Sequence, residues 1–468
     1  MPVLSTRTAA ESETGVLRSP GRSDVLDVVG IGFGPSNLAL AIALAEHNQE
    51  VPEADRVSAR FYERKPAFGW HRGMLLKDTT MQVSYLKDLV SMRNPCSRFS
   101  FLSYLHARDR LVDFINHKTL FPSRREFHDY LEWSAQPFGD AVDYGREVVD
   151  VVPVEEAGEV THFQVLTRAG GPQAEPTVQR ARNVVVAGGL RPRLPDGTSL
   201  SDRVWHTSEL LDRLETLPAG AARTPRSFTV VGAGQSAAET VAHLHGEFPD
   251  ADIHAVFARY GYAPADDSAF VNKIFDPEAV DHFYTSPDDV KEMMFDYHRS
   301  TNYSVVDIEL IDELYRRLYQ EKVAGKQRLH VHNLTRLLTA DAGDEHVRVG
   351  IEFLPTGRQD VLRTDYLVLA TGYRPTDLNG ILGSAEPILR TDDKGRVCVN
   401  RDYSVESILP GPAAIYLQGP TEHSHGIASS LLSNTAVRAG EITKALAKRL
   451  VRDIDAPRAP ALTAAAPL

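Results

Sequence analysis

The chain has 468 residues, of which 51 are Lys or Arg and 63 are Asp or Glu, so its formal net charge at pH 7 is −12. A chain of this length is expected to form two or three domains, because a single hydrophobic core stops growing at roughly 250–300 residues. The acidic balance argues against a nucleic acid or a membrane surface as a partner, since both attract basic proteins. It leaves room for a local basic pocket that binds a small anion.

The chain contains two cysteines, Cys96 and Cys398. They are too few for a disulfide framework or a four-cysteine zinc site, and their spacing excludes a CxxC redox pair. No stretch reaches the roughly 18 consecutive apolar residues of a transmembrane helix. Residues 1–23 lack the apolar core of a secretory signal, so we expect a cytoplasmic protein. From their composition, residues 1–23 and 451–468 are predicted to be disordered tails.

Between these tails, β-branched runs alternate with helical runs, which is typical of an α/β fold with parallel sheets. One motif occurs twice, about 200 residues apart. Its first copy is an apolar strand at 25–29, a glycine turn and a helix over about 38–46. Such a turn lets the backbone approach a pyrophosphate, and the helix N-terminus offers free N–H groups. The residues predicted to bind a dinucleotide here are Gly30, Gly32, Gly34, Pro35, Ser36 and Asn37.

The strand that follows this helix, 60–62, ends at Glu63, whose carboxylate suits a pair of ribose hydroxyls. Glu63 comes later in the chain than the motif usually has its acidic residue, which indicates an insertion around Pro52. Pro35 also replaces the usual third small residue. A glycine turn without a ligand is the alternative, but the strand, glycines, helix and acidic residue occur together here.

The second copy begins with a strand at 228–231 and has the spacing G-x-G-x-x-A. The next strand, 252–257, is followed by Arg259 instead of an acidic residue. A cation at this place favours a 2′-phosphate and therefore NADPH over NADH. The alternative is that Arg259 is an ordinary solvated arginine. The other residues predicted to bind the second dinucleotide are Gly232, Gly234, Gln235 and Ser236.

Two dinucleotide sites in one chain indicate a flavin and a nicotinamide that face each other. An apolar strand at 366–369 leads into Ala370, Thr371 and Gly372. We expect this strand to return the chain to the first sheet, with Thr371 and Gly372 at a cofactor. The predicted fold has two Rossmann-like domains, the NADPH domain being inserted in a discontinuous FAD domain, with a small substrate-binding region. The predicted boundaries are 24–200 and 345–450 for the FAD domain, the latter with a substrate-binding helix, and 201–344 for the NADPH domain with substrate-binding segments.

The lack of paired cysteines excludes a disulfide reductase. One of the remaining candidates is a flavin enzyme that activates O₂ with electrons from NADPH. From about 25 to 442, the chain resembles the microbial flavin-dependent N-hydroxylating monooxygenases, which act on L-ornithine or L-lysine in hydroxamate siderophore biosynthesis. The most specific block is Met-Gln-x-Ser-x-Leu-Lys-Asp-Leu at 81–89. The other segments that carry the resemblance are 32–38, 70–74, 122–127, 232–236, 270–275, 302–307, 370–373 and 425–433.

The resemblance implies a set of substrate residues. Lys87 would bind the α-carboxylate with help from Asn272, and a zwitterionic amino acid does need a cation for its carboxylate in a partly dehydrated site. Asn302 would lie near flavin C4a and the nicotinamide amide. Leu431 and Ser433 would line the pocket for the side-chain amine. Alone, Lys87 could be a solvated helix lysine, Asn302 a turn or helix-cap residue, and Ser433 a plain helix hydroxyl.

The same resemblance places Gln82 near the flavin, as a catalytic residue with Lys87 and Asn302. It also places Trp70 and His71 in the flavin region and Arg124 on the nicotinamide side. The alternative for Arg124 is an ion pair with Glu126 or Asp129. We expect no metal, because no cluster of carboxylates accompanies the histidines at 71, 423 and 425. The aromatic residues at 99, 101 and 104 are expected in the core.

The implied reaction is N-hydroxylation of the side-chain amine of L-ornithine to N5-hydroxyornithine through a C4a-hydroperoxyflavin, with FAD, NADPH and O₂. The amine must be neutral, and its pKa is near 10.4 by the lysine reference, so activity should rise toward mildly alkaline pH. Asn272 and the 302–307 segment look like the ornithine branch of the family. L-Lysine or a diamine is the alternative substrate, since one methylene changes binding by only about 1–3 kcal/mol.

Two other classes stay open from the residues alone. One is a flavin monooxygenase that oxygenates a ketone or a sulfide, which would not need Lys87 and Asn272. The other is a non-catalytic flavoprotein that binds NADPH. The family resemblance also implies a homo-oligomer, often a tetramer.

Overall fold

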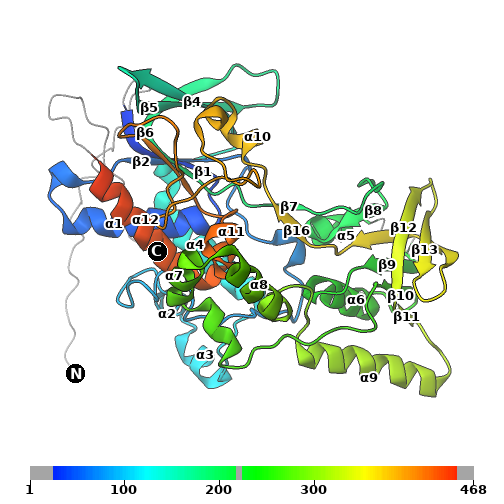
Figure 1. Cartoon of the computed structure of the whole chain (residues 1–468). Coiled ribbons are helices and arrows are strands. Elements are labelled where there is room, and N and C mark those ends of the chain that lie inside the picture. The colour runs from blue at the N-terminus through cyan, green and yellow to red at the C-terminus, as the bar shows by residue number, and fades with distance from the viewer. Residues whose placement is uncertain (1–24, 218–223, 451–468) are drawn as a thin grey trace, which may run out of the picture.

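The computed structural model describes residues 25–217 and 224–450, except for the side chains of residues 299, 300 and 302. Both predicted tails lie outside the described residues. Two α/β units lie side by side, the first on the left of Figure 1 and the second on the right. No helix in the described ranges is both long and apolar enough to cross a membrane.

The first unit is built on a seven-stranded sheet in the order β3-β2-β1-β6-β5-β4, with β17 pairing with β6. β1, β2, β3, β6 and β17 run parallel, while β4, β5 and β6 form an antiparallel meander. β1 is buried at all but its first residue, which explains its continuous apolar run. The strands are β1 (Val25–Ile31), β2 (Ala59–Glu63), β3 (Val142–Tyr144), β4 (Arg146–Glu156), β5 (Glu159–Ala169), β6 (Thr177–Val186) and β17 (Ala414–Leu417).

Helices α1 (Pro35–Glu50) and α12 (Thr435–Arg449) pack against each other in the first unit, although they lie almost 400 residues apart in the chain. Three further helices, α2 (Phe101–Ala107), α3 (Leu111–His117) and α4 (Arg124–Ala135), complete this side. Phe99, Phe101 and Tyr104 are almost fully buried in the same hydrophobic cluster. The prediction that this aromatic stripe belongs to the core is therefore confirmed.

The second unit has a parallel five-stranded sheet in the order β11-β10-β9-β15-β8. Apolar side chains from one face of this sheet pack with α6 and α9, and those from the other face pack with an antiparallel sheet of β12, β13 and β14. The strands are β8 (Val204–His206), β9 (Ser227–Val231), β10 (Asp252–Val256), β11 (Leu329–His332), β12 (Thr335–Ala342), β13 (Val347–Phe353), β14 (Arg358–Thr364) and β15 (Tyr366–Leu369); the helices are α5 (Leu210–Glu215), α6 (Gln235–Glu247) and α9 (Ile308–Ala324).

One strand was expected in the wrong sheet. β15 pairs with β9 and β8 of the second sheet, whereas the sequence led us to expect its return to the first. An apolar strand that ends in Ala-Thr-Gly could lie next to either glycine turn, so its sequence alone does not indicate which sheet it joins. The strand that returns to the first sheet is β17. We therefore propose that the inserted unit continues to about residue 372 instead of 344.

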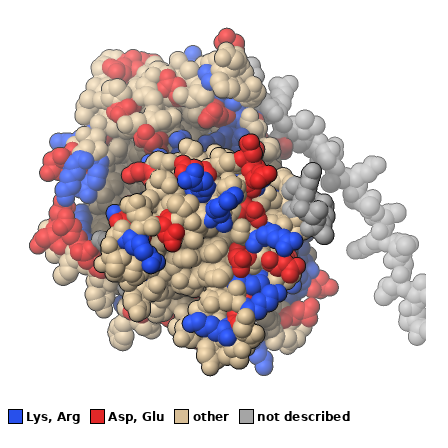
Figure 2. Space-filling view, turned by 90° about the vertical axis from the view of Figure 1, so that its right-hand side faces the viewer, with Lys and Arg blue, Asp and Glu red and all other residues tan. Residues whose placement is uncertain are grey.

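The chain crosses between the units twice, and the two crossings pair with each other as β7 (Leu190–Pro192) and β16 (Tyr373–Pro375). Further elements are α7 (Pro277–Thr285), α8 (Asp288–Asn302), α10 (Asn379–Leu382) and α11 (Glu422–His425). The short 3₁₀ helices used below are η6 (Val271–Phe275), η8 (Ile427–Ser430) and η9 (Leu432–Asn434). Figure 2 shows the face on the side of the second unit, where basic and acidic side chains are interspersed.

Candidate active site

The first glycine turn follows β1 and admits no side chain at its first two glycines. A Cβ on Gly30 would lie 2.2 Å from the Phe61 ring, and one on Gly32 would lie 2.4 Å from the Ala187 carbonyl oxygen. Gly32 also has a φ of +82°, which favours glycine. A Cβ on Gly34 would meet nothing within 4 Å, so the backbone is open to a ligand there. α1 starts at Pro35, a position where proline is favoured because the first helical N–H has no partner in the helix.

Residues of the first unit hold this turn in shape. Glu63, at the end of β2 as predicted, accepts hydrogen bonds from the backbone N–H of Phe33 (2.8 Å) and Lys65 (2.9 Å). The fully buried Asn37 donates to the carbonyl oxygens of Ile31 (3.2 Å) and Gly32 (2.7 Å). The open backbone at Gly34, the free helix N-terminus and the Glu63 carboxylate together fit a dinucleotide.

The second glycine turn is closed by residues from other parts of the second unit. Gly232 has a φ of +148°, and a Cβ there would lie 2.2 Å from the carbonyl oxygen of Ala370 at the end of β15. A Cβ on Gly234 would lie 3.2 Å from Cα of Ser304. Arg259 is exposed and donates to the Ser304 carbonyl oxygen at 2.8 Å. The predicted cation thus lies close to the predicted turn.

Thr371 and Gly372 lie between the end of β15 and the crossing strand β16. The Thr371 hydroxyl donates to the carbonyl oxygen of Arg193, and the Gly372 carbonyl oxygen accepts from the Arg193 N–H at 2.9 Å. The buried His206 ring also contacts the Gly372 carbonyl oxygen, at 3.1 Å. These two predicted residues therefore belong to the second unit and its connection to the first.

Trp70 and His71 lie where the first unit meets the crossing strands. The His71 ring centroid is 4.9 Å from that of Trp70 and 5.8 Å from that of Tyr373 on β16. Trp70 packs against Phe127 of the first core. Desolvation of the His71 imidazole by the surrounding protein, together with the charges of Arg124 and Lys65, lowers its pKa to about 4. This imidazole is therefore neutral at pH 7.

A polar network joins the two units. Arg124 donates two hydrogen bonds of 2.8 Å to Glu239 on α6, and Gln235 donates to the same carboxylate at 3.0 Å. Gln235 and Gln82 both donate to the carboxylate of Asp307, at 2.9 and 3.2 Å. Burial is the largest influence on Asp307 and raises its pKa, and the neighbouring Glu239 carboxylate adds to the increase.

This network replaces the partners suggested in the alternative for Arg124 and adds two residues. The suggested partners of Arg124, Glu126 and Asp129, instead lie against Arg110, at 3.3 and 2.8 Å. Glu239 and Asp307 were not singled out as site residues. Asp307 ends the 302–307 segment and Glu239 lies three residues beyond the 232–236 segment, but nothing in the sequence shows that these parts of the chain meet.

The predicted substrate residues come from segments that the fold gathers. The Lys87 ammonium lies 5.8 Å from the centroid of the Phe275 ring on η6, the short helix that also carries Asn272. η6 in turn contacts α8 and η8. Leu431 directly follows η8, and Ser433 is buried in η9. The segment around Lys87 is a series of turns, so the alternative of a lysine on a helix is wrong.

Asn302 is the last residue of α8, and its side chain lies outside the described part of the structure. The neighbouring Tyr303 hydroxyl donates to the Glu422 carboxylate at 2.7 Å, and the Ser430 hydroxyl donates to the same oxygen at 2.8 Å. Burial, together with the Glu422 charge, raises the pKa of Tyr303. These bonds tie the end of α8 to the segment that precedes Leu431. Glu422 was not predicted, because sequence reasoning considered only the neighbouring histidines.

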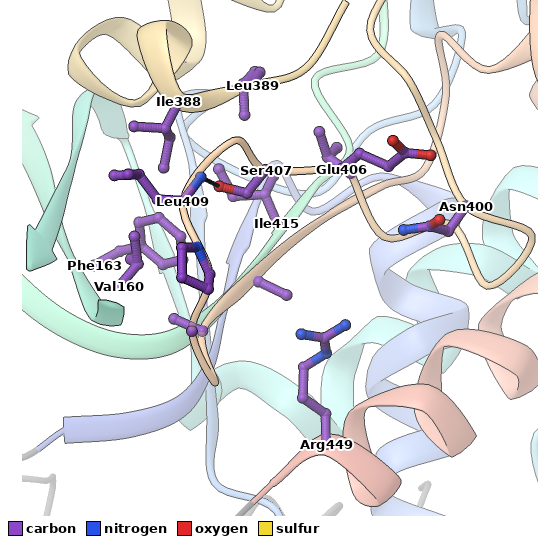
Figure 3. A pocket seen from close by; sticks show the side chains of 15 residues that line it. Val160, Phe163, Ile388, Leu389, Asn400, Glu406, Ser407, Leu409, Ile415 and Arg449 are labelled. Carbon is purple, nitrogen blue, oxygen red and sulfur yellow. Dashed lines mark hydrogen bonds between the residues drawn. The ribbon is translucent and has the colours of Figure 1, made fainter. Parts of the chain in front are cut away.

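A separate cavity of about 290 Å³ lies between β5, β17 and the 388–413 segment. Figure 3 shows Arg449, near the end of α12, pointing toward it. None of the predicted site residues lines this cavity. His423 and His425 contact the carbonyl oxygens of Val397 and Arg401. Among the described residues, no group of three or more His, Cys, Asp or Glu side chains is arranged to hold a metal ion.

Comparisons with known proteins agree with this arrangement. A family model described as L-lysine 6-monooxygenase/L-ornithine 5-monooxygenase matches residues 24–375. The L-ornithine N(5)-monooxygenase of Burkholderia cepacia is 42% identical over 412 residues, which cover 86% of this chain and 90% of that protein. An ornithine N-hydroxylase structure from Kutzneria sp. 744, described with reduced FAD, NADP⁺ and L-ornithine, is 44% identical with a TM-score of 0.85, covering 91% of this chain and 99% of that one.

The ornithine hydroxylase structure from Pseudomonas aeruginosa is 36% identical with a TM-score of 0.83, covering 91% of this chain and 99% of that one. These matches confirm the α/β fold with two nucleotide-binding units and the resemblance noted in the sequence. The chain therefore belongs to the L-lysine 6-monooxygenase/L-ornithine 5-monooxygenase family.

Proposed function

We propose that this chain is an FAD- and NADPH-dependent monooxygenase that hydroxylates the side-chain amine of L-ornithine to give N5-hydroxyornithine. The observation that carries this proposal is the gathering of Lys87, η6 and the η8–η9 segment in one region. The names of the similar proteins from Burkholderia and Kutzneria support ornithine as the substrate. L-Lysine stays the second candidate, because the family description includes it.

The two glycine turns divide the cofactors between them. The first turn would hold FAD, with its diphosphate at the N-terminus of α1 and a ribose at Glu63. The second turn would hold NADPH, with Arg259 at the 2′-phosphate. When bound, NADPH and FAD supply the electrons and the activated oxygen that the reaction needs. We propose that Gln82, Trp70, His71 and Arg124, which lie where the units meet, line the space between the cofactors.

The substrate residues would bind the amino acid at both ends. Among the described residues no carboxylate pairs with Lys87, so its ammonium is available for the substrate α-carboxylate. Asn272, whose amide nitrogen donates to the Asp267 carbonyl oxygen at 2.7 Å, would assist it with its amide oxygen or after a change of partner. Leu431 and the Ser433 hydroxyl would surround the side-chain amine, and Asn302 would approach the reacting end. The amine must reach this pocket without its proton, so turnover is expected to rise toward mildly alkaline pH.

The test is hydroxylamine formation by the purified protein with FAD, NADPH and O₂, when L-ornithine, L-lysine and putrescine are offered in parallel. We expect product with L-ornithine. Product with L-lysine or putrescine alone would reject the substrate assignment, and NADPH oxidation to peroxide with all three would reject the reaction. Lys87→Met should raise the KM for ornithine about a hundredfold, since it removes a charge-assisted contact. The matched control Lys273→Met, an exposed lysine on η6, should leave the KM unchanged.

We also propose a homo-oligomer, a tetramer by analogy with the family, in the cytoplasm, whose product feeds hydroxamate siderophore synthesis. The assembly is supported by α9, which exposes four apolar side chains spaced seven, four and four residues apart: Ile308, Tyr315, Tyr319 and Val323. Exposed apolar stripes of this kind are characteristic of protein interfaces. Light scattering would reject the assembly if the purified protein were monomeric at micromolar concentration.

A further inference from the structure

Arg438 is a fully buried arginine whose partners in the described structure are all uncharged. It lies at the end of the first turn of α12 and is 2% exposed. Its guanidinium donates to the Ser429 carbonyl oxygen, to Oγ1 of Thr435 (3.3 Å), to Oε1 of Gln418 (3.4 Å) and to Oγ of Ser36 (3.2 Å). Because neutral partners do not offset a charge, a cation in this position is costly to bury.

The nearby acidic residues are already engaged. Glu441, one turn further along α12, accepts two hydrogen bonds from Arg401, at 2.9 and 3.0 Å. Asp281, the other partner of Arg401, has a side chain that is 57% exposed, so water screens its charge. Burial lowers the pKa of Arg438, whereas the Glu441 and Tyr403 groups raise it. The buried charge is therefore only partly compensated by the described residues.

Two arms lead from Arg438 to the first turn of α1. One arm is the direct bond to Ser36. The other runs through Gln418, which accepts from Arg438 and donates to Asn37 at 2.9 Å, and Asn37 donates to the carbonyl oxygen of Gly32. Both arms end at the helix N-terminus behind the first glycine turn. Because the Ser36 oxygen accepts from Arg438, its hydroxyl proton is free to donate to an anion.

We propose that Arg438 is a positioning residue for the FAD diphosphate, which acts through Ser36 and supplies positive charge from behind the helix N-terminus. The inference rests on the proposed binding of FAD to the first glycine turn. The diphosphate would bring the negative charge that the surroundings of Arg438 lack. A charge-assisted chain, from guanidinium to hydroxyl to phosphate oxygen, would hold the cofactor more firmly than the helix N-terminus alone.

The experiment compares the FAD affinity of the apoprotein with that of its variants, measured by quenching of flavin fluorescence. We expect Arg438→Gln to raise the Kd for FAD about tenfold or more, and Arg438→Lys, which keeps the charge, to recover part of the loss. The matched control is Arg60→Gln. It removes an arginine of the first sheet that pairs with Asp143, and it should leave the Kd for FAD unchanged. Equal Kd values for wild type and Arg438→Gln would overturn the inference.

A second readout separates this role from simple packing. If Arg438 only packs, Arg438→Gln lowers the melting temperatures of the apoprotein and of the FAD complex equally, which would overturn the inference. We expect instead a smaller rise in melting temperature when FAD is added. In a double-mutant cycle with Ser36→Ala, we expect the losses in FAD affinity to be non-additive, and additive losses would count against the chain through Ser36. Failure of the wild-type apoprotein to bind FAD would reject the proposed function itself.

Discussion

The two glycine turns have the same local design but are held by different surroundings. In each, a glycine with positive φ lies against the carbonyl oxygen at the end of a neighbouring strand, Ala187 for the first turn and Ala370 for the second. The first turn is fixed by Glu63, which accepts a hydrogen bond from the turn's own backbone. At the second turn Arg259 is exposed and reaches across to Ser304 instead.

This difference indicates how each site is assembled. The residues that fix the first turn all belong to the first unit, so this site forms when the first unit folds. The second turn lies against Ser304, on the connection between α8 and α9 that also carries Asp307. Its geometry therefore depends on how that connection sits between the units. We expect a firmly held cofactor at the first turn and a more readily exchanged one at the second.

Substitution of the glycines should separate the two sites and have the largest effect. Gly32→Ala places a Cβ against a carbonyl oxygen at a positive φ, so it should abolish FAD binding and all turnover. Gly232→Ala should abolish NADPH binding while FAD stays bound. Flavin absorbance of the purified variants and NADPH titration measure the two effects.

Gly34→Ala is the control for the first turn. Its Cβ would meet no protein atom within 4 Å, so the melting temperature of the apoprotein should be that of wild type. The methyl group would still occupy space where a diphosphate approaches, so FAD affinity should fall. If Gly34→Ala bound FAD as wild type does, the diphosphate would not lie at this turn.

The buried ion pair between the units should have the next largest effect. In Arg124 and Glu239 the side chains are 13% and 5% exposed. Arg124→Met would leave the Glu239 carboxylate without its charged partner, so the free energy of unfolding should fall by about 3–5 kcal/mol. Urea unfolding measures it. The comparison is Arg336→Met, which breaks a more exposed pair with Glu352 and should cost at most about 1 kcal/mol. Equal losses in the free energy of unfolding would mean that the pair between the units stabilises the protein no more than an exposed pair does.

Removal of the exposed cation at the second turn should have a moderate, selective effect. Arg259→Gln should raise the KM for NADPH about tenfold, because a charge-assisted phosphate contact is lost, and leave the KM for NADH unchanged. The control is Arg363→Gln, which removes an exposed arginine on β14 and should leave the KM for NADPH unchanged. Parallel increases for both nucleotides would show that Arg259 does not contact the 2′-phosphate.

Much of this design is readable from the sequence because it is local. A strand, a glycine turn, a helix and the residue that ends the next strand lie within a few tens of residues, so the positions of Gly30, Glu63, Gly232 and Arg259 at the two turns could be predicted. What could not be predicted depends on contacts between distant segments. The placement of β15 is one case, since its pairing partner is decided by the whole sheet.

The bonds that hold the site together are equally non-local. Arg124 donates to Glu239, which is 115 residues away in the chain, and Arg438 donates to Ser36, which is 402 residues away. Neither partner is marked by spacing or by residue type, because many acidic and hydroxyl residues would serve equally well. The family resemblance led to the proposed substrate residues without these contacts, since a motif contains the residues that recur and leaves out those that position them.

The smallest expected effect is on the pH dependence of stability, which tests how the second turn depends on its surroundings. Burial raises the pKa of Asp307 above that of the same carboxyl in the unfolded chain, so the folded protein binds this proton more tightly. Protonation of Asp307 therefore stabilises the fold, and this contribution is lost as pH rises from about 3.9, the ordinary Asp value, through the raised pKa. Asp307→Asn should remove that part of the slope, an effect below about 1 kcal/mol because the group is partly solvated. Urea unfolding over this pH range, with the exposed Asp312→Asn on α9 as control, measures it. If the stability of wild type relative to Asp307→Asn rose over this pH range instead of falling, the carboxylate, rather than the acid, would be the form that the network of Gln82 and Gln235 prefers to hold.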